Sequence, residues 1–270
     1  MCGTIMPQAM LILVDGLRPD ALSAARCPTL ESLSSRGAWT LRASSVRPSV
    51  TLPCAFSMLH GVAPEAHFVT ANRYEQAADR PPGLIELACA ASLRCASFYN
   101  WEPLRDLSRP GAAALSFFYN ARDSDLDADD VLVDEIVRLM PRYRPDFALV
   151  YLGTVDIAGH KHGWMSAAYL AQVNRVDRLV GRVLSAVSPA TTVLLASDHG
   201  GHDHTHGDGI PEDMLIPWII AGPGIRAGQC IRRQVSLIDT APTLARVMNL
   251  GPPPAWTGRA VDEAFAGSGA

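Results

Sequence analysis

The sequence predicts an α/β fold with a largely parallel central sheet, and two patterns indicate it. Three short apolar runs, at residues 9–14, 147–152 and 192–196, have the length and composition of buried strands. Segments with apolar residues at helical spacing lie between them. Strands that alternate with helices favour parallel pairing, because a parallel connection needs a crossover long enough for a helix. We therefore expect a layered α/β architecture.

The first strand ends at Asp15-Gly16, and a helix is expected over 28–36, where Gly37 stops it. An apolar helix should begin close to Thr51, because Pro53 favours a first helical turn. The remaining helices are expected at 128–140 and 167–187. The carboxyl ends of the three strands should meet at one edge of the sheet, where open α/β sheets bind their ligands.

Composition and charge exclude several classes of protein. The 270 residues hold 23 Lys and Arg against 27 Asp and Glu, a net charge of −4, with the basic residues scattered. This balance argues against a nucleic-acid polymer as partner. The run Ala9–Val14 is far shorter than the roughly 20 residues that cross a bilayer, so no membrane partner is expected. The N-terminus lacks a basic and a long apolar region, which predicts a cytoplasmic location.

We expect one domain over residues 1–270, since no linker, repeat or low-complexity segment divides the chain. Its ordered core should run from about residue 8 to about residue 250, because the Pro-rich stretch at 251–254 and the Gly/Ala tail are typical of a frayed end. Six cysteines without C-x-x-C spacing are typical of reduced thiols.

Acidic and imidazole side chains stand where the three strands end. Asp15 follows the first strand, Asp156 and His160 follow the second, and the pair Asp198-His199 follows the third. If a helical turn follows residue 153, Asp156 and His160 lie one turn apart on one face. A mixture of nitrogen and oxygen ligands suits zinc better than magnesium or calcium. The set predicts a divalent-metal site.

Each of these groups also has a plainer explanation. Asp15 and Asp198 could serve only as turn residues, and the run His202-x-His204-x-His206 could be a solvated loop. The metal interpretation is stronger than these explanations because all of the groups follow the ends of apolar strands in one α/β chain. The choice among the three histidines of the run stays open at this point.

Thr51 is a candidate nucleophile. It stands at the start of an apolar helix, where a threonine most often acts as an N-cap. Beside a bound metal it has a second role, because the helix N-terminus and the cation would both favour its alkoxide.

The chain resembles the alkaline phosphatase superfamily, and within it the type I phosphodiesterases and nucleotide pyrophosphatases. The resemblance implies an alkaline-phosphatase-like three-layer α/β/α sandwich. It depends on an ordered set of short motifs that spans residues 14–224: Val14-Asp15-Gly16, Thr51-Leu52-Pro53, Asp156-x-x-Gly159-His160-x-x-Gly163, Ser197-Asp198-His199-Gly200, Thr205-His206-Gly207, Pro217 and Gly222-Pro223-Gly224.

The resemblance also implies a reaction and a site. The chain would hydrolyse small-molecule phosphate esters, most readily phosphodiesters or nucleotide pyrophosphates, through Thr51 as nucleophile. Two divalent metal ions would assist, Zn²⁺ first and Mn²⁺ as the alternative. One ion would be held by Asp156, His160 and His206. The other would be held by Asp15, Asp198, His199 and the Thr51 hydroxyl.

Two departures from the family pattern keep alternatives open. An asparagine is expected shortly after the nucleophile, where this chain has Cys54-Ala55, and Phe68 replaces a glycine after His67. A phosphomonoesterase of the same superfamily, or a catalytically silent metal-binding relative, therefore remains an alternative. Two other classes lack their motifs: a serine hydrolase would need a Gly-x-Ser-x-Gly elbow, which does not occur, and a nucleotide-binding protein would need a glycine fingerprint after the first strand.

Overall fold

A single mixed sheet organises the protein. The computed structural model describes residues 8–73, 80–122 and 125–267. Its strands lie in the order β4-β3-β5-β1-β6-β7-β2-β8. Their bounds are β1 Ala9–Val14, β2 Ala38–Ser44, β3 Cys95–Tyr99, β4 Leu115–Phe118, β5 Phe147–Leu152, β6 Thr192–Ala196, β7 Leu215–Ala221 and β8 Gln229–Cys230.

The first strand of the chain lies at the centre of this sheet. In β1, Ala9 pairs in parallel with Phe147 of β5 on one side and with Thr192 of β6 on the other. Only β7 runs antiparallel to its neighbours β6 and β2, so the sheet is largely parallel. The three predicted strands are confirmed, and their carboxyl ends meet at the same edge, as expected.

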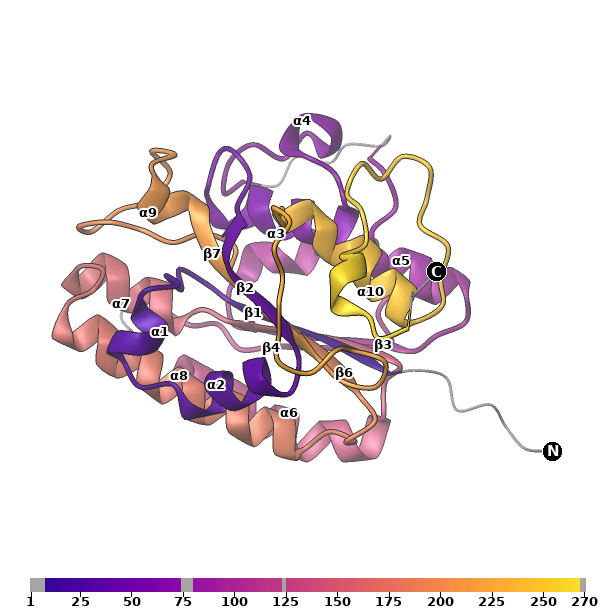
Figure 1. Ribbon diagram of the computed structural model, residues 1–270, viewed down its shortest axis with the longest axis horizontal. Helices are drawn as coiled ribbons and strands as arrows, with labels where there is room; N and C mark the ends of the chain where they lie inside the picture. The colour runs from indigo at the N-terminus through magenta and orange to yellow at the C-terminus, as the bar shows by residue number, and fades with distance from the viewer. Residues whose placement is uncertain (1–7, 74–79, 123–124, 268–270) are drawn as a thin grey trace.

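Helices cover both faces of the sheet, as Figure 1 shows. Leu11 and Leu13 of β1 face one apolar core, and Met10 and Ile12 face the other, because successive strand residues point to opposite sides. The first core is closed by α3 Thr51–His60, α5 Leu84–Ala90 and α10 Thr240–Val247. The second is closed by α1 Ala21–Ala24, α2 Pro28–Ser35, α6 Ala128–Tyr143, α7 Thr154–His162 and α8 Ala167–Ser185. The predicted three-layer sandwich is confirmed.

Short helices complete the described chain. They are α4 Pro64–His67, α9 Pro211–Met214, and the 3₁₀ helices η1 Glu102–Leu107, η2 Leu237–Asp239 and η3 Asp262–Ala264. No described helix is both long enough and apolar enough to span a membrane. The described cysteines are all free, and Cys2 lies outside the described residues.

The expected end of the ordered core near residue 250 is wrong. Trp256, Val261 and Phe265 are buried, and the indole N–H of Trp256 donates to the carbonyl of Pro82 at 2.8 Å. Burial of large apolar side chains stabilises the folded state, so this segment packs against the rest of the protein instead of fraying. The packed structure therefore continues through residue 265.

Candidate active site

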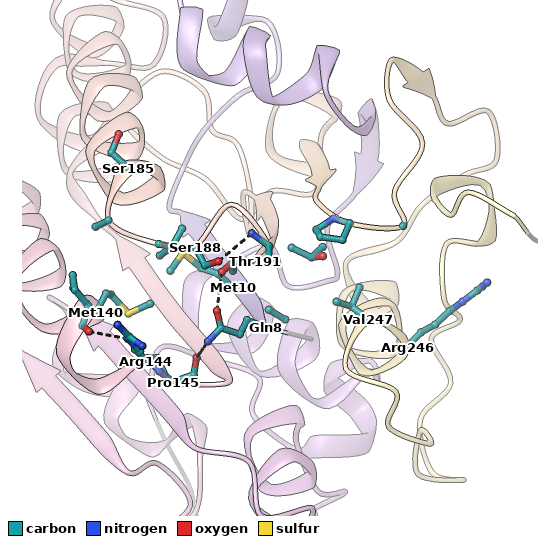
Figure 2. Close-up of a pocket in the computed structure, with 18 of the residues that line it drawn as sticks. Gln8, Met10, Met140, Arg144, Pro145, Ser185, Ser188, Thr191, Arg246 and Val247 are labelled. Carbon is teal, nitrogen blue, oxygen red and sulfur yellow. Dashed lines mark hydrogen bonds between the residues drawn. The ribbon is translucent and has the colours of Figure 1, made fainter. Parts of the chain in front are cut away.

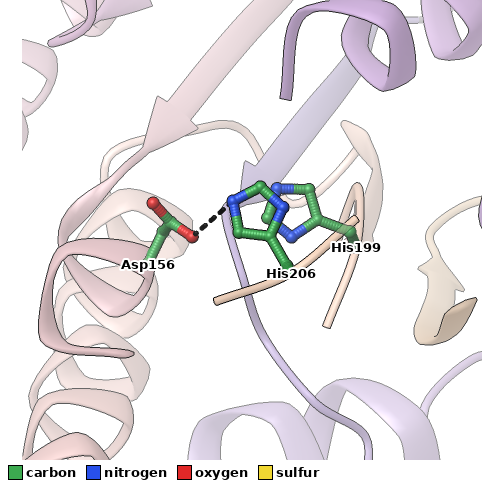
Figure 3. Close-up of side chains that lie close together, drawn as sticks. All are labelled: Asp156, His199 and His206. Carbon is green, nitrogen blue, oxygen red and sulfur yellow. Dashed lines mark ion pairs between the residues drawn. The ribbon is translucent and has the colours of Figure 1, made fainter. Parts of the chain in front are cut away.

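Side chains from three neighbouring strand ends converge at one edge of the sheet. Asp15 follows β1, Asp156 lies in the first turn of α7 after β5, and Asp198-His199 follows β6. The ligand atoms of Asp15, Asp198 and His199 all lie within 4.8 Å of one another. Those of Asp156, His199 and His206 form a second such group, drawn in Figure 3. The sequence-predicted candidates are thus brought together, with His199 shared by both groups.

His206 is the member of the histidine run that lies in the site. Its ring stacks on His199 with 3.8 Å between ring centroids, and its Nε2 lies 3.8 Å from Asp156 Oδ1. Its Nδ1 donates to the carbonyl of Ser49 at 2.9 Å, which leaves Nε2 free to bind a cation. His202 Nδ1 instead lies 2.8 Å from Asp213 Oδ1, and His204 Nδ1 donates to the backbone carbonyl of His160 at 3.0 Å.

His160 lies at the rim of this arrangement. Its Nε2 is 3.4 Å from Asp156 Oδ2, one helical turn away as the spacing predicts, and 45% of its side chain is exposed. It stands outside both compact groups, with its ring centroid 5.0 Å from that of His206. The geometry therefore makes His160 an outer ligand candidate beside Asp156.

The carboxylates of the site lack the partners that burial normally requires. Within the described part of the chain, Asp15 Oδ1, Asp156 Oδ1 and Asp198 Oδ2 are buried and accept no hydrogen bond. Burial, reinforced by neighbouring carboxylates, raises the pKa of Asp156 and of Asp198 well above the usual range. Uncompensated buried carboxylates are costly, and a divalent cation would satisfy them. The residues therefore fit a metal centre.

The histidines of the site are held in the form that binds metals. Burial lowers the pKa of His199, and burial together with the neighbouring His199 lowers the pKa of His206 to about 3. Both imidazoles are therefore neutral at physiological pH, as metal ligation requires. Neutral nitrogen and carboxylate oxygen donors together suit Zn²⁺.

Thr51 points its hydroxyl at the same centre. It is the first residue of α3, and the N-cap position is taken by Val50, so Thr51 does not cap the helix. The buried Thr51 Oγ1 lies 3.4 Å from Asp15 Oδ2 and 3.3 Å from His199 Nε2. A hydroxyl at a helix N-terminus between these groups is placed to act as a nucleophile.

The structure brings an asparagine beside Thr51, although Cys54-Ala55 stands where the family pattern has one shortly after the nucleophile. Asn72 lines the same cavity as Thr51, and its Oδ1 accepts the backbone N–H of Leu52 at 2.9 Å. Because that bond uses the oxygen, the Nδ2 amide remains as a donor, and it makes no hydrogen bond to a described residue. Sequence reasoning missed Asn72 because it lies in a loop 21 residues after Thr51, and no local pattern places that loop beside α3.

Tyr151 is a second residue that sequence reasoning missed. It is the penultimate residue of β5, and its hydroxyl donates to Asp15 Oδ2. Burial and the nearby Asp15 raise the pKa of Tyr151, which keeps the phenol protonated as a donor. Its position one residue before the strand end was the available signal, since that end faces the site.

The cavity at this edge has a volume of about 350 Å³. Its lining includes Thr51, Asp15 and Asp156, together with Trp101 and Arg122. A larger cavity of about 970 Å³ is lined by residues at the amino ends of β1 and β6, among them Met10 and Thr192 (Figure 2). None of the site residues named above lines that larger cavity.

Comparison with known proteins identifies the family of the chain. Residues 9–216, well over half of the chain, match the model of the family "Type I phosphodiesterase / nucleotide pyrophosphatase". Among curated proteins, mouse ectonucleotide pyrophosphatase/phosphodiesterase family member 1 is 25% identical over 226 residues, covering 72% of this chain and 24% of that protein. A phosphoglycerate mutase of Desulforudis audaxviator, of the 2,3-bisphosphoglycerate-independent type, is 36% identical over 119 residues, 42% of this chain and 23% of that protein. The chain thus spans about a quarter of the length of the curated relatives it matches.

Solved structures share the fold. An inactive variant of murine ectonucleotide pyrophosphatase/phosphodiesterase 5, in complex with AMP, superposes with a TM-score of 0.75 at 13% identity, over 92% of this chain and 96% of that chain. A phosphonate monoester hydrolase from Silicibacter pomeroyi gives a TM-score of 0.77 at 17% identity, over 97% and 77% of the two chains. The sheet, the order of the motifs and the matched family model lead to one conclusion: this chain belongs to the type I phosphodiesterase / nucleotide pyrophosphatase family of the alkaline phosphatase superfamily.

Proposed function

We propose that the protein hydrolyses small-molecule phosphodiesters or nucleotide pyrophosphates, with Thr51 as nucleophile and two zinc ions as cofactors. One observation supports this function above the others. Three buried carboxylate oxygens that accept no hydrogen bond from the described residues lie close to the neutral His199 and His206, directly beside the hydroxyl of Thr51. Such a set is costly to fold unless cations fill it.

The donor sets divide between two ions. Asp156, His206 and the rim residue His160 would hold one, and Asp15, Asp198, His199 and Thr51 Oγ1 would hold the other. When bound, the ions would neutralise phosphoryl charge and lower the pKa of the threonine hydroxyl, as in other two-metal sites.

The residues of the chain would then perform two displacements. Thr51 loses its proton to solvent, and its Oγ1 attacks phosphorus while the alcohol or phosphate substituent leaves. The covalent intermediate is a phosphodiester that joins Thr51 Oγ1 to the remaining substituent of the substrate. Water then hydrolyses its bond to Thr51, which returns the free hydroxyl and releases a phosphate monoester. Two displacements in line give net retention at phosphorus.

Asn72 and the outer wall of the cavity would hold the substrate. The Nδ2 amide of Asn72 would donate to a phosphoryl oxygen, because its Oδ1 is already fixed by the Leu52 N–H. Trp101 and Arg122 would face the substituent that extends away from Thr51. A planar ring and a cation favour a diester that carries an aromatic or anionic group.

The decisive experiment compares kcat/KM for bis-p-nitrophenyl phosphate and p-nitrophenyl phosphate on the zinc-loaded protein. A diester preference of a hundredfold, about 2.7 kcal/mol of transition-state binding, supports the proposal. A monoester preference would make the protein a phosphomonoesterase of the same superfamily. Zinc binding without turnover of either ester would make it a catalytically silent relative.

The nucleophile is tested separately by Thr51→Ala. This variant should bind zinc but lose more than about 99% of turnover, and no phosphorylated protein should be detected by intact mass after acid quenching. Thr243→Ala is the matched control, because it removes another buried helical threonine hydroxyl, in α10. Substantial activity in Thr51→Ala would remove Thr51 from the nucleophile role.

A further inference from the structure

One tryptophan contacts the segments that supply the aspartate and histidine candidate metal ligands. Trp164 follows α7, and only 7% of its surface is exposed. We propose that Trp164 is a positioning residue that sets the spacing of the two metal-ligand groups. The inference rests on the proposed two-metal function, although it assigns Trp164 no contact with an ion.

The indole is clamped between two glycines from different ligand segments. Gly159 lies on α7 between Asp156 and His160, and a Cβ placed there would come within 2.5–2.6 Å of the indole ring atoms. Gly201 follows His199, and a Cβ there would meet the same three ring atoms. Only hydrogen at both α-carbons allows the ring to pack this closely, so the ring fixes the distance between the two segments.

Hydrogen bonds tie the same residue to the remaining segments. The indole Nε1–H donates to the carbonyl of Gly16, next to Asp15, at 2.9 Å. The backbone N–H of Trp164 donates to the carbonyl of Asp203 at 2.8 Å, in the loop that leads to His206. One residue therefore joins the strand-end loops after β1 and β6 to helix α7.

The ring also lies beside the outer imidazoles. Its centroid is 5.0 Å from that of His160, edge to face, and 5.9 Å from that of His206. Both residues are candidate ligands of one ion, whereas Gly16 and Gly201 adjoin ligands of the other. Loss of the ring would therefore change the position of one group relative to the other.

Trp256 provides a matched control elsewhere in the fold. It has the same 7% exposure, its indole N–H donates to the Pro82 carbonyl, and a Cβ at Gly61 would come within 2.9 Å of its ring. It packs at the end of α3 remote from Thr51, and it adjoins no candidate ligand. Comparison of the two tryptophans separates positioning of the metal groups from general stability.

The experiment loads the full chain with Mn²⁺ and measures the exchange-coupled dimanganese signal by electron paramagnetic resonance, together with Mn²⁺ affinity by calorimetry and the Tm of the metal-free protein. Trp164→Leu should replace the coupled signal by that of isolated ions and weaken binding at least about tenfold. Trp164→Phe, which keeps a ring but loses the N–H, should give an intermediate signal. Trp256→Leu should lower Tm comparably and leave the coupled signal unchanged.

Three outcomes would overturn the inference. The first is an unchanged coupled signal and affinity in both Trp164 variants, and the second is an equal loss of the signal in Trp256→Leu. The third is a wild-type protein that binds no pair of ions, and this outcome alone also removes the two-metal function. If Trp164→Leu does not fold, the comparison of Trp164→Phe with Trp256→Phe decides in the same way.

Discussion

Asn72 holds the start of α3 with the oxygen of its amide, and in the proposed mechanism its Nδ2 donates to substrate, so the two roles can be separated by substitution. Asn72→Asp keeps an oxygen for the Leu52 N–H, 2.9 Å away, and removes the Nδ2 donor. Asn72→Ala removes both. We expect the aspartate variant to fold as the wild type does but to lose catalysis.

The magnitudes follow from the two interactions. Loss of one donor to a developing phosphoryl charge typically costs 10²- to 10³-fold in kcat, about 2.7–4 kcal/mol. Loss of the bond to the Leu52 N–H costs about 1 kcal/mol, or roughly 2–4 °C in Tm for a chain of this size. Asn72→Asp should therefore lower kcat at least about a hundredfold with Tm nearly unchanged, because a carboxylate is also favoured at a helix N-terminus.

The assay measures kcat and KM for bis-p-nitrophenyl phosphate on zinc-loaded protein, with thermal unfolding in parallel. Asn72→Ala should show both the catalytic loss and the lower Tm. If Asn72→Asp kept more than about a tenth of the wild-type kcat, the reasoning that assigns the Nδ2 amide to the phosphoryl group would be refuted.

Three further predictions follow from charge and burial. Arg122→Gln should lower kcat/KM for a nucleoside triphosphate by on the order of tenfold and leave bis-p-nitrophenyl phosphate nearly unaffected, and equal effects on both would contradict a role in binding an anionic substituent. Zinc binding at pH 7 should release protons held by Asp156 and Asp198, whose pKa values are raised, so the binding enthalpy should vary with buffer ionisation enthalpy; a buffer-independent enthalpy would oppose this. Burial lowers the pKa of His67 to about 4, so the stability that its neutral form contributes is present above pH 6.5 and is lost, by up to about 3 kcal/mol, as the pH falls to 4. Urea unfolding at pH 7 and 4.5 should show a smaller decrease for His67→Gln, and identical decreases would show that His67 does not titrate as inferred.

The central strands could be predicted from sequence because their apolar residues are continuous and their ends carry acidic residues. The bounds of β1, β5 and β6 are those expected, since strands buried on both faces leave no polar positions inside the run. Strands β2, β4 and β8 were not predicted, because their burial is partial or their runs are short. β3 was also missed, although it is fully buried, because Ser97 interrupts its apolar run.

The residues of the candidate site also fall into a group that could be predicted and a group that could not. Residues that follow a predicted strand could be placed, because the sheet brings strand ends together. Asn72 and Trp164 could not, since their positions depend on the paths of a loop and a helix end that no local pattern defines. The choice of His206 over His202 and His204 required the stacking on His199 and the pairing of His202 with Asp213.

The central position of β1 determines when the site can form during synthesis. In β1, Ala9 pairs with Phe147 and Thr192, so β1 stays unpaired until β5 or β6 has been made. Such distant pairing is slow and leaves an apolar strand exposed to aggregation while translation proceeds. The last metal-ligand candidate, His206, follows β6, so a nascent chain stalled before it has an incomplete cation site. A cation bound at the proposed site would therefore stabilise only the finished sheet, and expression should depend more on chaperone capacity than on metal supply.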